Sequence, residues 1–77
     1  MYETNYSVVY TPKGTSRKLM HETREFEENI KSKAKAIRMA EKAVKEGHYN
    51  IFVDKYEYDK EIDCNDLIMS WSFGKHY

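Results

Sequence analysis

Residues 33–46, in the middle of the chain, carry sequence signals for a helix and for both of its ends. This segment is dense in Ala, Lys and Glu, which favour helix, and it contains neither glycine nor proline. Ser32 before it is a good N-cap residue, and Gly47 stands where helices commonly end. The sequence therefore predicts one helix over residues 33–46. The face that we expect to pack against the rest of the protein consists of Ala34, Ile37, Ala40 and Val44.

Two extended segments precede this helix. Residues 6–11 are rich in Val, Tyr and Thr, and they lead directly into a turn sequence at residues 12–15. Residues 18–26 carry three apolar side chains among polar ones. We assign them as the strand that returns from the turn, with a short helix as the alternative.

Two more strands follow the helix. Residues 49–58 are rich in β-branched and aromatic side chains, residues 59–66 form a polar loop, and residues 67–73 are again typical of a strand. The resulting order is ββαββ. We expect a single α+β domain over residues 1–77, a two-layer sandwich in which one helix covers one face of a four-stranded antiparallel sheet.

The size and composition of the chain exclude several classes of protein. With 77 residues, 40% of them apolar and 34% charged, the chain has material for one packed core and none for a pocket that encloses a large cofactor. No apolar run approaches the roughly 20 residues that a membrane-spanning helix needs. The single cysteine, Cys64, precludes an internal disulfide. Because this is typical of a reducing compartment, we expect a cytoplasmic protein that enters no membrane.

Candidate catalytic and metal-binding groups are weak. The polar loop has carboxylates at alternate positions, as calcium loops do, but it has Cys64 where such a loop needs glycine and Ser70 where it needs glutamate. The three histidines lack the spacing of metal ligands. The acidic surroundings of Cys64 make it a poor nucleophile. We therefore expect no metal, no cofactor and no catalytic activity.

One helix covers only one face of a four-stranded sheet, so the other face is open. Strict alternation in the third strand puts Phe52, Tyr56 and Tyr58 on the same side. We take these three residues as a candidate interaction surface. Three roles stay open for it: cross-strand pairs that only stabilise the sheet, a symmetric homodimer that buries the face, or stacking of a ligand such as a nucleic-acid base.

Five basic side chains recur along the helix at i, i+4, i+7, i+11 and i+14, a spacing that places them on one face. Several are like-charged i,i+4 neighbours, each pair destabilising the helix by roughly 0.2–0.5 kcal/mol. A compensating role is contact with phosphates. The alternative is that the stripe is only a solvated helix face built from good helix formers. This basic stripe consists of Lys31, Lys35, Arg38, Lys42 and Lys45.

Charge is unevenly distributed although the net charge is zero. Residues 30–46 hold six basic and two acidic side chains, a balance of +4, whereas residues 54–77 hold six acidic and three basic ones, a balance of −3. A third role for the stripe follows, namely attraction to an acidic loop of a second copy or of another protein.

No motif in the sequence assigns the chain to a family. The residues favour a small non-enzymatic binding protein, with nucleic acid as the first candidate ligand through the basic stripe. The alternative is a protein-interaction or inhibitor module, of the compact kind carried by phages and mobile elements. Such a module would use the aromatic sheet face or the acidic loop.

Overall fold

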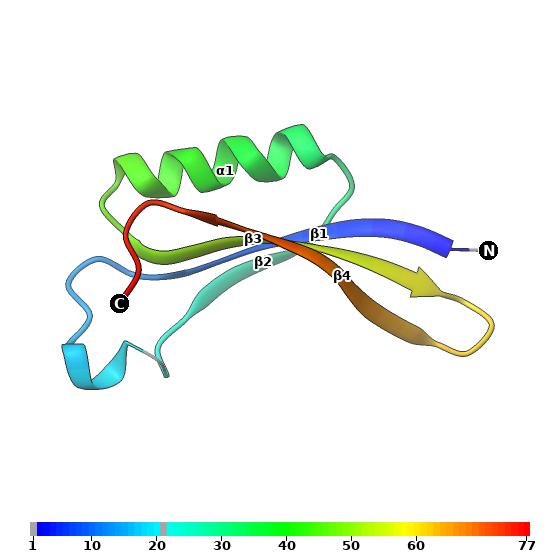
Figure 1. Ribbon diagram of the computed structural model, residues 1–77, viewed down its shortest axis with the longest axis horizontal. Helices are drawn as coiled ribbons and strands as arrows, with labels where there is room; N and C mark the ends of the chain where they lie inside the picture. Colours follow the sequence, from blue (N-terminus) through cyan, green and yellow to red (C-terminus); the bar gives the residue numbers. More distant parts are fainter. Residues whose placement is uncertain (1, 21) are drawn as a thin grey trace.

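The computed structural model describes residues 2–20 and 22–77 and has the predicted ββαββ order, with one additional short 3₁₀ helix (Figure 1). The α+β class is confirmed. The elements in chain order are β1 (Tyr2–Thr11), η1 (Arg17–Leu19), β2 (Glu25–Ile30), α1 (Lys33–Lys45), β3 (Tyr49–Asp59) and β4 (Cys64–Phe73).

The four strands form one sheet in the order β2-β1-β3-β4, in which every neighbouring pair is antiparallel. Because β2 and β3 both run antiparallel to β1, they are parallel to each other with β1 between them. The connection from β2 to β3 is α1, which lies across one face of the sheet (Figure 1). The predicted two-layer sandwich with one helix on one face is therefore confirmed.

Capping determines both ends of α1, as the sequence predicts. The Ser32 hydroxyl accepts a hydrogen bond from the backbone amide three residues later, at 3.2 Å. At the other end Gly47 adopts a φ of 87°, which glycine tolerates better than other residues. The amides of Gly47 and His48 donate to the carbonyls of Val44 and Ala43 at 3.0 and 3.1 Å. This pattern is a Schellman motif.

The core lies between α1 and the sheet face that carries alternate residues of β1 and β3, including Val8 and Val53. Four residues at the margin, Tyr10, Met39, Trp71 and Phe73, pack against it while staying partly exposed. The buried apolar side chains are Tyr6, Val8, Ile30, Ala36, Ala40, Ala43, Ile51 and Val53.

The helix face expected to pack on the sheet is wrong at three of its four positions. Ala40 is buried, but Ala34 is exposed, Ile37 is only partly buried, and Val44 keeps 40% of its surface exposed. The sheet supplies the large side chains of the core, so the room beneath the helix axis suits methyl groups, and the larger helix residues lie at the margin. The helix residues buried in the core are Ala36, Ala40 and Ala43.

The strand predicted over residues 18–26 is also wrong in position. Its first part contains η1, as the alternative reading expected, with the Leu19 amide donating to the Ser16 carbonyl at 2.8 Å. The Thr11 hydroxyl donates to the Met20 carbonyl at 3.1 Å, and this hydrogen bond connects the segment after η1 to the end of β1. The strand itself begins at Glu25. Near Asn29, which has a φ of 59°, the pairing of β2 with β1 shifts register. The shift breaks the alternation of side chains between the two sheet faces, so a period-two pattern in the sequence does not reveal this strand.

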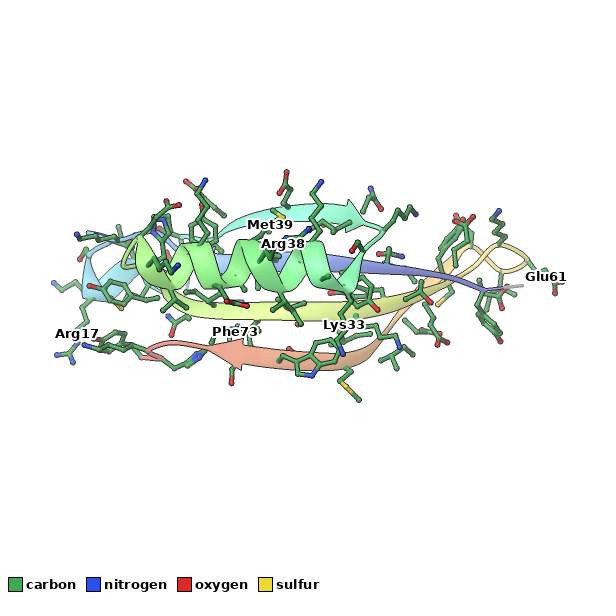
Figure 2. All side chains as sticks on the ribbon, turned by 90° about the horizontal axis from the view of Figure 1, so that it is seen from above. Arg17, Lys33, Arg38, Met39, Glu61 and Phe73 are labelled. Atoms are coloured by element: carbon green, nitrogen blue, oxygen red, sulfur yellow. The ribbon has the colours of Figure 1, made fainter. Side chains whose placement is uncertain are left out.

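Strands β1, β3 and β4 extend beyond the end of α1 and form a projecting arm (Figures 1 and 2). The predicted loop at 59–66 is shorter than expected, because pairing continues to Asp59 and Cys64 and leaves a turn between them. The Tyr58 hydroxyl donates to Asp63 across this turn. The arm gives the molecule an elongated shape of 41 × 25 × 15 Å.

Candidate nucleic-acid interface

The five residues of the basic stripe are all exposed, but the prediction that they share one helix face is wrong for Lys31. Lys31 precedes the extended N-cap residue Ser32 and lies outside the helix. The other four, Lys35, Arg38, Lys42 and Lys45, lie within α1 on the side away from the buried alanines. Figure 2, which looks onto the helix, shows Arg38 in the middle of this outer surface. From Lys35 to Lys45 the four helical residues of the stripe extend for about 15 Å at 1.5 Å per residue. The helix therefore presents one straight row of cations to solvent.

Acidic side chains neutralise little of this row. Lys42 Nζ lies 3.8 Å from Glu46 Oε1, and the Lys42 side chain is 79% exposed, so the attraction is weak. Within residues 2–20 and 22–77, the other four members of the stripe have no carboxylate oxygen within 4.0 Å. Four cations are therefore free to pair with an external anion.

Lys33 belongs to a different side of the helix. Its ammonium lies 4.6 Å from the ring centroid of Trp71, which places it at the margin beside β4 (Figure 2). A cation over an indole face is held by the ring quadrupole. Sequence reasoning missed this contact, because the two residues are far apart along the chain and nothing in their spacing joins them.

A groove of 460 Å³ runs beside the stripe, between α1 and β2. Its floor is apolar, with Val8, Met39 and Ala43 among its lining residues. Its polar rim carries three carboxylates and one ammonium. This excess of negative charge repels phosphate, so an anion-binding surface on α1 cannot extend into the groove. The charged rim residues are Glu25, Glu27, Lys42 and Glu46.

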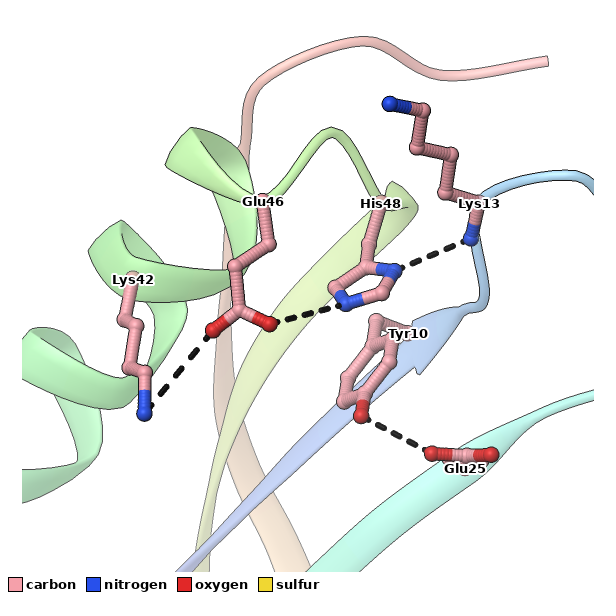
Figure 3. Close-up of polar contacts among 6 residues, drawn as sticks. All are labelled: Tyr10, Lys13, Glu25, Lys42, Glu46 and His48. Carbon is pink, nitrogen blue, oxygen red and sulfur yellow. Dashed lines mark hydrogen bonds and ion pairs between the residues drawn. The ribbon is translucent and has the colours of Figure 1, made fainter.

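The polar groups at the end of this groove satisfy one another (Figure 3). His48 Nδ1 accepts a hydrogen bond from the Lys13 amide at 2.9 Å, which leaves the Nε2 hydrogen directed toward Glu46 Oε2 at 3.4 Å. The His48 ring stacks on Tyr10 with centroids 4.5 Å apart. The Tyr10 hydroxyl donates to Glu25 at 2.9 Å, and this bond raises the pKa of the phenol. The network joins three elements, and no sequence signal pointed to it.

The candidate aromatic surface lies on the sheet face opposite α1. Phe52, Tyr56 and Tyr58 alternate on that face and are each partly buried. They do not form one continuous patch, because Asp54 lies between them and accepts a hydrogen bond from the Ser70 hydroxyl at 2.5 Å. The Tyr58 hydroxyl is already bonded to the hairpin turn. The structure therefore divides the proposed surface in two.

A different apolar row crosses the open face. Val9 pairs with Phe26 on one side and with Phe52 on the other, so the three side chains lie side by side across β2, β1 and β3. Phe26 is 62% exposed. The ring centroids of Phe52 and His76 are 5.0 Å apart, so the C-terminal tail partly covers Phe52. Sequence reasoning missed the row, because β2 was placed too early in the chain.

The surroundings of Cys64 disfavour its thiolate form. Its thiol donates to the Asp66 carboxylate at 3.2 Å, and this hydrogen bond, with the charge of Asp66 and then of Asp59 and Asp63, raises the pKa of the thiol. Within the described residues no group of three or more His, Cys, Asp and Glu side chains is arranged to hold a metal ion.

Asp66→Asn is expected to speed the reaction of Cys64 with an aromatic disulfide reagent at about pH 8, because it lowers the thiol pKa and raises the fraction of thiolate. The reaction is followed by absorbance. Asp63→Asn serves as the control and should change the rate less, because Asp63 makes the smallest contribution to the shift. Equal rates for the original protein and Asp66→Asn would contradict this account.

Comparison with protein-family models, with curated proteins and with solved structures finds no match. In the part of the chain that the structure describes, no helix has the length and apolar character to cross a membrane.

Proposed function

We propose that this protein is a non-enzymatic nucleic-acid-binding protein that contacts phosphates through the basic stripe of α1. The observation that carries the proposal is the set of five exposed cations, four of which have no carboxylate oxygen within 4.0 Å among the described residues. The single cysteine fits a reducing cytoplasm as its compartment.

Phosphate contact accounts for the cost of the stripe. Like-charged neighbours destabilise an isolated helix, and among the described residues the Lys42–Glu46 contact is the one ion pair that a member of the stripe makes. A bound phosphate backbone would neutralise the row and release counterions. The helical part of the stripe, about 15 Å long, matches about four base pairs at 3.4 Å per step. Such contacts carry no sequence information, so we expect binding that tolerates any base sequence.

A salt titration tests this proposal. Fluorescence anisotropy with a labelled duplex longer than the stripe should give a slope of log K against log salt of about −3.6 to −4.5, from four or five contacts at −0.9 each. Affinity should fall about 150- to 500-fold between 50 and 200 mM salt. A single strand should give a shallower slope, since each contact then contributes about −0.7. Absence of binding at the lowest salt would make α1 a solvated face and overturn the proposal.

A second candidate function, a protein-interaction or inhibitor module, draws on the open sheet face. The apolar row of Phe26, Val9 and Phe52 is the feature that favours it, because exposed aromatic side chains commonly anchor protein interfaces. The two functions depend on opposite surfaces. Phe26→Ala should leave phosphate binding unchanged, whereas it should weaken capture of a protein partner.

A further inference from the structure

The two edges of the sheet differ in how they are protected. Alternate residues of an edge strand direct their N–H and C=O groups away from the sheet, and proteins usually guard such edges with charge, proline or bulges. Strand β2 is short, carries glutamate at three of its six positions, and is distorted at Asn29. Strand β4 has ten residues, and its segment 67–73 contains no charged residue and no proline. The pairing of β4 with β3 is interrupted by a register shift near Ile68.

The β4 edge also carries exposed apolar side chains. Three consecutive residues of β4 are about half exposed: Leu67 at 55%, Ile68 at 48% and Met69 at 50%. Leu67 pairs with Tyr56 and Met69 with Lys55, so these two side chains lie on opposite faces of the sheet. A layer stacked on one face would cover only one of them. An additional strand alongside β4 would cover both.

We propose that the occupant of this edge is a second copy of the same chain, with β4 pairing antiparallel to β4 about a twofold axis near Ser70. Self-pairing in this register sets the uncharged segment 67–73 against itself. It also brings Asp66 close to Gly74 and Lys75 of the second copy, an acidic residue next to a basic one. The twofold axis is perpendicular to the sheet, so the dimer has eight continuous strands with both helices on the same face.

The other edge pairings are less favourable. Pairing of β2 with β2 brings glutamates against glutamates. Pairing of β2 with β4 leaves one free β2 edge and one free β4 edge, so further copies would add and form a filament. Pairing of β4 with β4 uses the same edge of both copies and gives a closed dimer. The dimer does not depend on nucleic-acid binding. If both occur, the dimer carries two basic stripes on one surface.

The mass of the protein in solution tests the dimer. Sedimentation equilibrium over a range of concentrations should approach twice the 9.2 kDa of one chain. Ile68→Lys should raise the dimer dissociation constant at least about 100-fold, because it puts a charged residue into the uncharged edge segment, and an edge lysine opposes pairing with another strand. Leu19→Lys is the matched control: Leu19 has the same 48% exposure but lies in η1, and this variant should dimerise normally.

Hydrogen exchange supplies a second readout that does not depend on mass. Those amides of β4 that point away from β3 should be protected at high concentration in the original protein and unprotected in Ile68→Lys. Circular dichroism verifies that the variant is folded. A protein that stays monomeric at every concentration overturns the proposal. So does a dimer that survives Ile68→Lys and is lost in Phe52→Lys, because that result assigns the contact to the open face.

Discussion

Replacement of Ile51 with alanine is expected to lower the free energy of unfolding by about 2–5 kcal/mol, the range for truncating a buried isoleucine. A single core in a chain of this length supplies no more than about 3–5 kcal/mol. The variant should therefore be largely unfolded at physiological temperature. Urea denaturation followed by circular dichroism measures the loss.

The size of this effect follows from the packing around Ile51. The side chain is fully buried, and the helix lies over this part of the core with alanines. Alanine methyl groups cannot move into the space that a truncated isoleucine leaves, so the cavity persists and its cost is added to the lost burial.

Ile62→Ala provides the matched control. Ile62 lies in the hairpin turn between β3 and β4 and is 69% exposed, so the same truncation there should change stability by less than about 0.5 kcal/mol. Equal losses in the two variants would contradict the assignment of Ile51 to the core.

Reversing three charges of the basic stripe is expected to weaken nucleic-acid binding about 10²- to 10³-fold at 100 mM salt. The variant combines Lys35→Glu, Arg38→Glu and Lys42→Glu. Each lost phosphate contact removes about 0.9 from the salt slope, which equals a factor of about eight in affinity at this salt concentration. Three contacts together give the expected loss. The slope itself should become shallower than about −2, which anisotropy measures in the same titration.

A control variant distinguishes the stripe from the overall charge of the protein. Arg17→Glu, Lys18→Glu and Arg24→Glu change the net charge by the same amount, and all three residues are exposed in or near η1. This variant should bind with a nearly unchanged slope. If it loses as much affinity as the helix variant, binding reflects net charge and not a defined surface.

Local interactions explain why sequence reasoning succeeded where it did. The ends of α1 depend on hydrogen bonds that join residues three to five positions apart, and Ser32 and Gly47 supply them whatever the rest of the chain does. The exposure of Lys35, Arg38, Lys42 and Lys45 likewise follows from helical periodicity. The acidic environment of Cys64 was also foreseeable, because the carboxylate that bonds its thiol is two residues away.

Other features depend on residues that are distant in sequence. The irregular pairing of β2 at Asn29 hid that strand, and the apolar row of the open face became visible only once its register was known. The groove network joins Tyr10 to Glu25 and Lys13 to His48, contacts across 15 and 35 residues that no local pattern encodes.

The sequence by itself therefore determined the order of the elements, the bounds of the helix and the basic face that the helix presents. The tertiary structure alone decided which helix residues are buried, which strands lie at the edges, and how the aromatic residues of the open face are divided. The physical reason is that capping and periodicity act within a turn or two of chain. Strand register and close packing depend instead on the shapes of surfaces brought together from distant parts of the sequence.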